Sequence, residues 1–199
     1  MKKPIVRRIM AFIIDSIIVS IIASSISSIK YINPDIDKYN ETYDSYVEFI
    51  NNSLKTSDAS NIMNSEEYQE IAYNLSYYGK YSSLISLVVS ILYYIGFQYI
   101  TKGYTGGKKL LRIKVEAEKG KLKIQNIIVR SLIINGIITS TLSLLIIFLL
   151  NKDLFFKMQS FVELLSMGLI FVSFAMMLTR EDGKGLHDLI AKTKVVYDK

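Results

Sequence analysis

The chain has 199 residues, of which 50% are hydrophobic and 21% charged, with 24 Lys and Arg against 18 Asp and Glu. Its mean hydropathy of +0.28 is high for so many charges, because soluble domains offset their apolar residues with about a quarter charged ones. The chain has no Cys and one His, which excludes a disulfide scaffold, a thiol nucleophile and a Cys or multi-His metal centre. We therefore expect a membrane protein without a metal or cofactor.

Four apolar blocks organise the chain, at about 9–29, 81–100, 127–150 and 161–178. A helix needs about 20 apolar residues to cross a hydrocarbon core, and the blocks come close to that length. They carry few charges: Asp15 in the first, Arg130 near the start of the third and Glu163 at the start of the fourth. The pattern predicts an all-α integral membrane protein, a single domain over 1–199 built as a four-helix transmembrane bundle.

The charges between the blocks predict which side each segment faces. Segment 101–126 carries eight Lys and Arg against two Glu, whereas 30–80 carries four Lys and nine acids. Since basic residues collect in short cytoplasmic segments, we expect loop 101–126, tail 179–199 and both termini in the cytoplasm and loop 30–80 outside. The net charge of +6 is then explained by the orientation of the chain across the lipid bilayer. Because no basic run is interleaved with aromatic residues, we expect no nucleic-acid binding.

The start of the chain also resembles a signal peptide, because Lys2 and Lys3 precede an apolar run and Ala23, Ser24 and Ser25 are small. Asp15 within the run, and its length, favour an uncleaved first helix. In this helix Ser16, Ser20 and Ser24 are spaced by four, and Gly136 and Ser140 repeat that spacing in the third block. Small residues at this spacing are typical of closely packed helices in lipid.

Loop 30–80 is too long for a simple turn. Its apolar and aromatic residues recur at helical spacing: Tyr39, Tyr43, Tyr46, Val47, Ile50 and Leu54. Asn64 and Glu67 are spaced as a capping box that would begin a helix running into the second block. We expect a partly helical loop, which is either a lid resting on the bundle or a domain that binds a protein partner.

Asp15 is the most informative residue, since a carboxylate at the centre of a span costs at least about 2.5 kcal/mol unless it is paired, hydrated or protonated. Arg8 lies on the same helical face, two turns away and too far for contact. Arg130 enters its block from the same side at a similar depth, and is the natural partner for Asp15. Two interpretations stay open: a structural lock between helices, or a cation or proton site with Asp15 as the titrating ligand.

The segments on the predicted cytoplasmic side form a platform. Glycines and Lys108 in 103–108 do not match the phosphate-binding loop, which requires four residues between its glycines and Ser or Thr after Lys. Alternation in 113–116 and a turn at 119–121 predict a β-hairpin returning through Leu122 and Ile124. We expect a short helix over 186–190 and a strand over 193–197 against that hairpin.

His187 and Asp188 are adjacent in that tail, and neighbours on a helix point about 100° apart, so we expect them to cap and orient rather than to form a dyad. Without a Ser, His and acid arrangement or paired acids at hydrolase spacing, the chain is not expected to be an enzyme.

These residues resemble the RDD family of small, mainly bacterial membrane proteins. Three groups carry the resemblance: Arg8, Ala11 and Asp15; Gly103, Thr105, Gly107, Lys108, Leu110, Ile113 and Val115; and His187, Asp188, Thr193 and Val195. Arg130 also matches an Arg common in such proteins, whereas Tyr104 and Gly106 stand where Gln and an apolar residue are usual. The resemblance implies a multi-pass protein of the bacterial inner membrane, with transport of unknown ligands or cation/proton exchange suggested for its members.

Two functions are therefore expected. In the first, a transporter or cation/proton exchanger uses Asp15 as its ligand-binding group, with Arg130 competing for it and Arg8 nearby; because four spans are few for a transporter, a homo-oligomer would be needed. In the second, a non-transporting accessory or regulatory protein docks a partner through its cytoplasmic platform or its outer loop.

Overall fold

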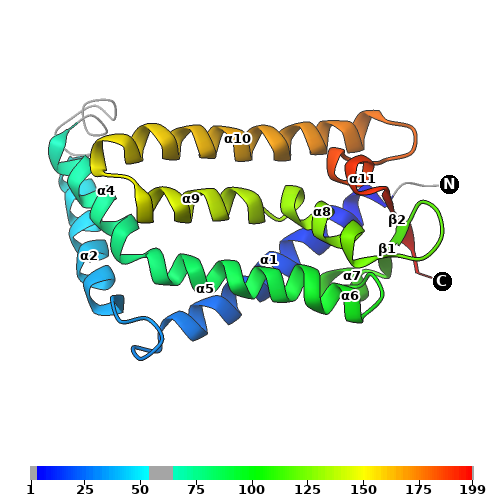
Figure 1. Cartoon of the computed structure of the whole chain (residues 1–199), viewed down its shortest axis with the longest axis horizontal. Coiled ribbons are helices and arrows are strands. Elements are labelled where there is room, and N and C mark those ends of the chain that lie inside the picture. Colours follow the sequence, from blue (N-terminus) through cyan, green and yellow to red (C-terminus); the bar gives the residue numbers. More distant parts are fainter. Residues whose placement is uncertain (1–3, 54–64, 199) are drawn as a thin grey trace.

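The computed structural model describes residues 4–53 and 65–198. Lys2, Lys3, Leu54 and Asn64, which entered the sequence predictions, lie outside these ranges. Figure 1 shows an elongated helical molecule whose long helices follow its long axis, with α2 and α4 at one end and the small sheet and both termini at the other. We call these the α2–α4 end and the terminal end.

Three helices are long and apolar enough to cross a membrane: α1 (Ile5–Ser27), the helix over Lys80–Ile100, and α10 (Lys152–Thr179). The second consists of α5 (Lys80–Ile91), a π-helical turn (Leu92–Phe97) and α6 (Gln98–Ile100). These three correspond to the first, second and fourth predicted spans, and α10 begins nine residues earlier than predicted. The chain is therefore mainly helical, as expected.

The third predicted span is not one helix. It is divided into α8 (Ile124–Ile134) and α9 (Ile137–Leu149), which meet at an angle of 62°. Gly136 at the junction has φ +66°, a left-handed conformation that glycine adopts without strain. Gly136 thus breaks the helix, and the predicted role in close helix packing is wrong for this residue. Four spans result only if this bent pair counts as one.

Two helices form the α2–α4 end. α2 (Ile36–Ser53) confirms the helical spacing predicted for this segment, and α4 (Glu66–Tyr78) packs against it. The hydroxyl of Ser65 caps α4 by accepting a hydrogen bond from the amide of Tyr68 at 3.2 Å, so the cap is one residue later than the predicted Asn64. α4 rests on the bundle through the ring of Tyr73, whose centroid lies 5.3 Å from that of Phe155.

The sheet at the terminal end joins distant parts of the chain. β1 (Ile113–Ala117) pairs antiparallel with β2 (Thr193–Tyr197), from Ile113 opposite Tyr197 to Ala117 opposite Thr193. The predicted hairpin is wrong, because the segment after β1 has a single apolar residue, Leu122, and leads directly into α8 at Ile124. The strand predicted over 193–197 is confirmed, with β1 alone as its partner in this sheet. Two short helices, α7 (Gly106–Leu110) and α11 (Leu186–Ala191), flank the sheet.

The long helices pack in the order α1, α5, α9, α10, and α7 lies against α1. Among these described helices α1 and α10 are not one of the closely packed pairs. α1 buries one face, formed by Arg8, Ala11, Asp15, Val19, Ala23 and Ser27. Ser20 and Ser24 lie beside this face and are exposed, so the prediction that they pack helices together is wrong for both.

Candidate functional site

Two arginines converge on one buried carboxylate at the terminal end. Arg8 of α1 pairs with Oδ2 of Asp188, and Arg130 of α8 pairs with Oδ1. The Asp188 side chain is 0% exposed and the arginine side chains are 7% exposed. The hydroxyl of Thr193 and the amide of Gly185 also donate to the carboxylate, at 3.3 Å and 3.1 Å. The first helix, the helix after the middle loop and the tail are thus joined at one point.

His187 completes this cluster as a neutral side chain. Its Nε2 lies 3.2 Å from Nη2 of Arg8, and a guanidinium can only donate, so Nε2 is the unprotonated acceptor. Nδ1 then carries the hydrogen and donates it to the hydroxyl of Ser173. Burial, followed by the charges of Arg130, Arg8 and Lys108, lowers the pKa of His187 far below its ordinary value.

His187 and Asp188 lie close together, although neighbours on a helix point about 100° apart. Nε2 of His187 lies 3.4 Å from Oδ2 of Asp188, because both side chains turn toward Arg8. The unprotonated Nε2 cannot donate to the carboxylate, and the two side chains therefore act as separate acceptors for Arg8.

Asp15 lies in a second cluster, made with the loop before α7 and with α7 itself. The side chain is 2% exposed. Its Oδ1 accepts hydrogen bonds at 2.7 Å from both the hydroxyl of Tyr93 and the amide of Gly107, and Oδ2 accepts one from the hydroxyl of Thr105. The ammonium of Lys108 lies 4.0 Å from Oδ2 and donates to the Thr105 hydroxyl at 3.2 Å. Thr105, Gly107 and Lys108 of the loop motif therefore all lie against the carboxylate of Asp15.

The predicted pair of Asp15 and Arg130 is wrong. Arg130 binds Asp188, and no ion pair joins it to Asp15 among the described residues. The prediction assumed that equal depth in two helices brings side chains together, but α7 folds back against α1 and places Lys108 beside Asp15 instead. The contact between Lys108 and Asp15 was indicated in the sequence only by the motif of Thr105, Gly107 and Lys108, which resembles the family's loop.

Two glycines allow the loop to approach α1. A Cβ at Gly107 would lie 2.5 Å from the carbonyl oxygen of Ala11, and one at Gly103 would lie 2.1 Å from that of Val115. Gly103 also has φ +102°, which is strained for any other residue. The sequence motif includes both positions but gives no indication of Tyr93, because the second apolar block is free of charge and offers no spacing signal.

A pocket of about 250 Å³ connects the two clusters. Its polar side is formed by Arg8, Asp15, Lys108, Arg130 and His187, and its apolar side includes Phe12 of α1 and Ile170, Phe174 and Met177 of α10. We call it the charged pocket. Burial, followed by the charge of Arg130, lowers the pKa of Lys108 from 10.5 to about 7, although Asp15 opposes this shift.

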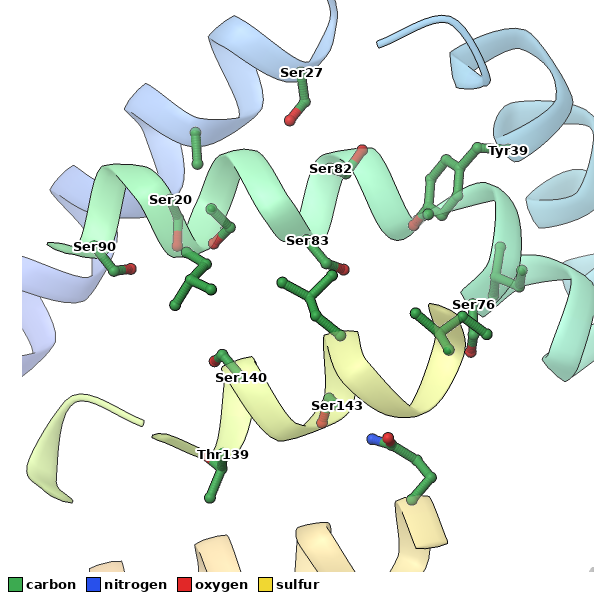
Figure 2. Close-up of a pocket in the computed structure, with 18 of the residues that line it drawn as sticks. Ser20, Ser27, Tyr39, Ser76, Ser82, Ser83, Ser90, Thr139, Ser140 and Ser143 are labelled. Atoms are coloured by element: carbon green, nitrogen blue, oxygen red, sulfur yellow. The ribbon is translucent and has the colours of Figure 1, made fainter. Parts of the chain in front are cut away.

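A second cavity, of about 810 Å³, lies nearer the α2–α4 end. We call it the serine cavity, because α1, α5 and α9 line it with hydroxyl groups, as Figure 2 shows for Ser20, Ser83, Ser90, Ser140 and Ser143. These five hydroxyls have no hydrogen-bond partner within the described part of the chain. Between the two spaces lies a buried apolar cluster of Val19, Ala23, Val89 and Tyr94.

No match was found among curated proteins or among solved structures. The model of one protein family, described as the RDD family, matches residues 3–192, which include the buried Arg8, Asp15 and Asp188. With this match over nearly the whole chain and three helices apolar enough to cross a membrane, the protein belongs to the RDD family and is membrane-associated.

Proposed function

We propose that the protein is a multi-pass carrier of the bacterial cell membrane that exchanges a monovalent cation for a proton at Asp15. One observation carries the proposal: a buried carboxylate lies 4.0 Å from a lysine whose pKa is lowered to about 7. A lysine with such a pKa gains and loses its proton near neutral pH, whereas an exposed lysine does not. The terminal end, rich in Lys and Arg, would face the cytoplasm.

The exchange follows from competition for one carboxylate. With Lys108 protonated, its ammonium neutralises Asp15. A cation bound to Asp15 would place a second positive charge beside Lys108 and lower its pKa further, so that Lys108 releases its proton. Oxygen atoms of Asp15, Thr105 and Tyr93 lie together, and hard cations prefer oxygen ligands. The substrate is therefore a small hard cation, with Lys108 rather than Arg130 as the internal competitor.

The serine cavity supplies access from the opposite side. A hydroxyl without a partner costs free energy in hydrocarbon, so the five hydroxyls without protein partners favour a cavity filled with water. On α1, residues 16–19 separate Asp15 from Ser20, which lines the serine cavity, and Val19 is the buried residue among these four. In this proposal the apolar cluster around Val19 and Tyr94 separates the cation site from the outer solution, and it must open for exchange.

The proposal is tested with purified protein in vesicles that contain a pH-sensitive dye. Na⁺, K⁺ and Li⁺ are added in turn outside, and the release of protons from the vesicle is followed. We expect exchange with the unchanged protein, loss of exchange in Asp15→Asn, and full exchange in Asp37→Asn, which alters an exposed carboxylate at the other end. Exchange that survives Asp15→Asn would contradict the proposal.

Lys108→Gln separates coupling from binding. This variant keeps Asp15 but lacks the group that releases the proton, so we expect a cation current without proton movement. Lys109→Gln serves as the control, because Lys109 is the next residue of α7 and is exposed. Loss of both currents in Lys108→Gln, in a variant that remains folded, would mean that Lys108 is not the coupling group.

The accessory function has one observation in its favour. α2 exposes Tyr43 and Val47, at 49% and 39%, on a helix with no fully buried residue. A partner bound there would remain with the protein in mild detergent and be released by Val47→Asp. A chain that always purifies alone would count against this second candidate.

A further inference from the structure

The charged pocket opens sideways between two helices. α1 and α10 both line this pocket but are not among the closely packed pairs of described helices, and the residues that line the pocket at this seam are partly exposed: Phe12 at 40%, Ile170 at 43% and Phe174 at 38%. Because both helices are apolar and long enough to span a membrane, lipid chains would surround the seam. The pocket therefore joins a lipid-facing apolar opening to a buried polar end.

The polar end holds more positive than negative charge. Arg8 and Arg130 share the single carboxylate of Asp188, and Lys108 faces Asp15. His187 is neutral, because its Nε2 accepts from Arg8. When Lys108 is protonated, three cations thus face two carboxylates, and one positive charge stays without a counterion. An uncompensated buried charge costs several kcal/mol, and an anion at this position would remove that cost.

We propose that the charged pocket binds the headgroup of an anionic phospholipid from the surrounding leaflet, with one acyl chain lying along the seam between α1 and α10. The phosphate supplies the missing negative charge at Lys108 and the two arginines. The acyl chain covers Phe12, Ile170 and Phe174, which line the pocket and are partly exposed. A free phosphate ion satisfies only the first requirement, and a neutral lipid only the second. This proposal does not depend on cation exchange, and the two compete at Lys108, because a bound phosphate keeps Lys108 protonated.

Binding is linked to the protonation of Lys108. A bound phosphate raises the pKa of Lys108 from about 7 back toward its ordinary value, so binding takes up a proton and is tighter at pH 6 than at pH 8. The groups facing Lys108 are Asp15 and Arg8 on α1, Tyr93 and Tyr94 on the second span, Arg130 on α8, and His187 and Asp188 on α11. Arginine side chains stay protonated in proteins and His187 stays neutral, which leaves Lys108 to respond to pH.

The experiment uses the delipidated full-length protein in a neutral detergent. Dioleoyl phosphatidylglycerol and dioleoyl phosphatidylcholine are added separately, and bound lipid is counted by native mass spectrometry while thermal unfolding is followed in parallel. We expect at least about tenfold tighter binding of phosphatidylglycerol, which corresponds to about 1.4 kcal/mol. Equal binding of the two lipids would overturn the proposal, as would equal stabilisation by inorganic phosphate.

Matched variants locate the headgroup and the chain. Lys108→Gln should lose most of the preference for phosphatidylglycerol, and Lys108→Arg should retain it, while Lys109→Gln should bind as the unchanged protein does. An equal loss in Lys109→Gln would show that the anionic lipid is attracted by the general surface charge of the protein, and would contradict a specific site at Lys108. If Lys108→Gln does not fold, Ile170→Trp decides the matter, because it fills the seam without altering a charge.

Phe171→Trp is the control for Ile170→Trp, since Phe171 is 74% exposed on the same helix and does not line the pocket. We expect reduced lipid binding in Ile170→Trp alone. Normal binding in Ile170→Trp would exclude an acyl chain in the seam. This experiment measures bound lipid, whereas the vesicle experiment with Asp15→Asn measures proton exchange. A negative result in one can therefore be distinguished from a negative result in the other.

Discussion

The ammonium of Lys108 lies 4.0 Å from the carboxylate of Asp15, and both side chains also contact the hydroxyl of Thr105. Burial, followed by the charges of Arg130 and Arg8, nevertheless lowers the pKa of Lys108 to about 7, because together these effects exceed the opposing effect of Asp15. A conventional salt bridge would raise the pKa of its lysine, whereas Lys108 can gain and lose its proton near neutral pH.

The stability of the protein should depend on the protonation of Lys108. The unfolded chain binds this proton below its ordinary pKa of 10.5 and the folded chain only below about 7. Between these values the unfolded state carries more protons, so the free energy of unfolding rises with pH, by at most about 1.4 kcal/mol per unit. Thermal unfolding in detergent from pH 6 to pH 9.5 measures this slope.

Lys108→Met should remove that slope and stabilise the protein at pH 6, because the buried charge is gone. Lys109→Met is the control and should keep the slope. If the unchanged protein and Lys108→Met respond alike to pH, Lys108 is not the titrating group.

Asp188→Asn should destabilise the protein strongly. The change leaves the guanidinium groups of Arg8 and Arg130 buried without a counterion, and breaking a buried pair in this way costs about 3–5 kcal/mol. Asp182→Asn removes an exposed carboxylate paired with Arg180, and should cost no more than about 1 kcal/mol. Fluorescence-detected gel filtration after heating compares the two, and equal losses would mean that the cluster does not stabilise the fold.

Gly107→Ala should displace α7 from α1. The new methyl group would lie 2.5 Å from the backbone oxygen of Ala11, which cannot move without shifting the helix. The hydrogen bond from the Gly107 amide to Asp15 would be lost as well. We expect a loss of about 2–3 kcal/mol.

Gly168→Ala is the matched control for Gly107→Ala, because a Cβ there has nothing within 4 Å and the residue lies inside α10. Replacing a helical glycine with alanine should stabilise by up to about 1 kcal/mol. Thermal unfolding of both variants in one detergent gives the comparison, and a destabilising Gly168→Ala would point to a partner packed on α10.

The serine cavity should contain water. The chain has no Cys, so a single introduced thiol can be labelled without background. Ser83→Cys and Ser143→Cys, which line the cavity, should react with a charged methanethiosulfonate reagent that does not cross membranes. Leu92→Cys, at a position 64% exposed on the second span, would face lipid and should stay unlabelled. Labelling of Leu92→Cys alone would exclude a hydrated cavity.

The sequence was sufficient to predict the helical class, the buried face of α1 and the strand over 193–197, because each depends on a local pattern. Arg8 and Asp15 are placed on one face by the 3.6-residue period alone. Family resemblance selected Thr105, Gly107, Lys108 and Asp188 as residues of interest. The match to the RDD family confirms that resemblance.

The partners of these residues could not be predicted in the same way. Asp15 meets Lys108 because a five-residue helix folds back onto α1, and neither hydropathy nor charge spacing encodes that turn. Arg130 meets Asp188 because the tail returns to the middle loop as a strand. Tyr93 and Ser173 lie in apolar blocks, where one polar group among many residues gives no signal until the tertiary contact is known. The homo-oligomer stays a prediction.

The convergence of Arg8 and Arg130 on Asp188 has a consequence for biosynthesis. Arg8 is made near the beginning of translation and Arg130 after about two thirds of it, whereas their shared carboxylate lies on α11, the last helix of the chain. Both arginines are therefore synthesised before the carboxylate that neutralises them. Their neutralisation, together with the pairing of β2 onto β1, completes the folding of the terminal end only after all the long helices have been synthesised.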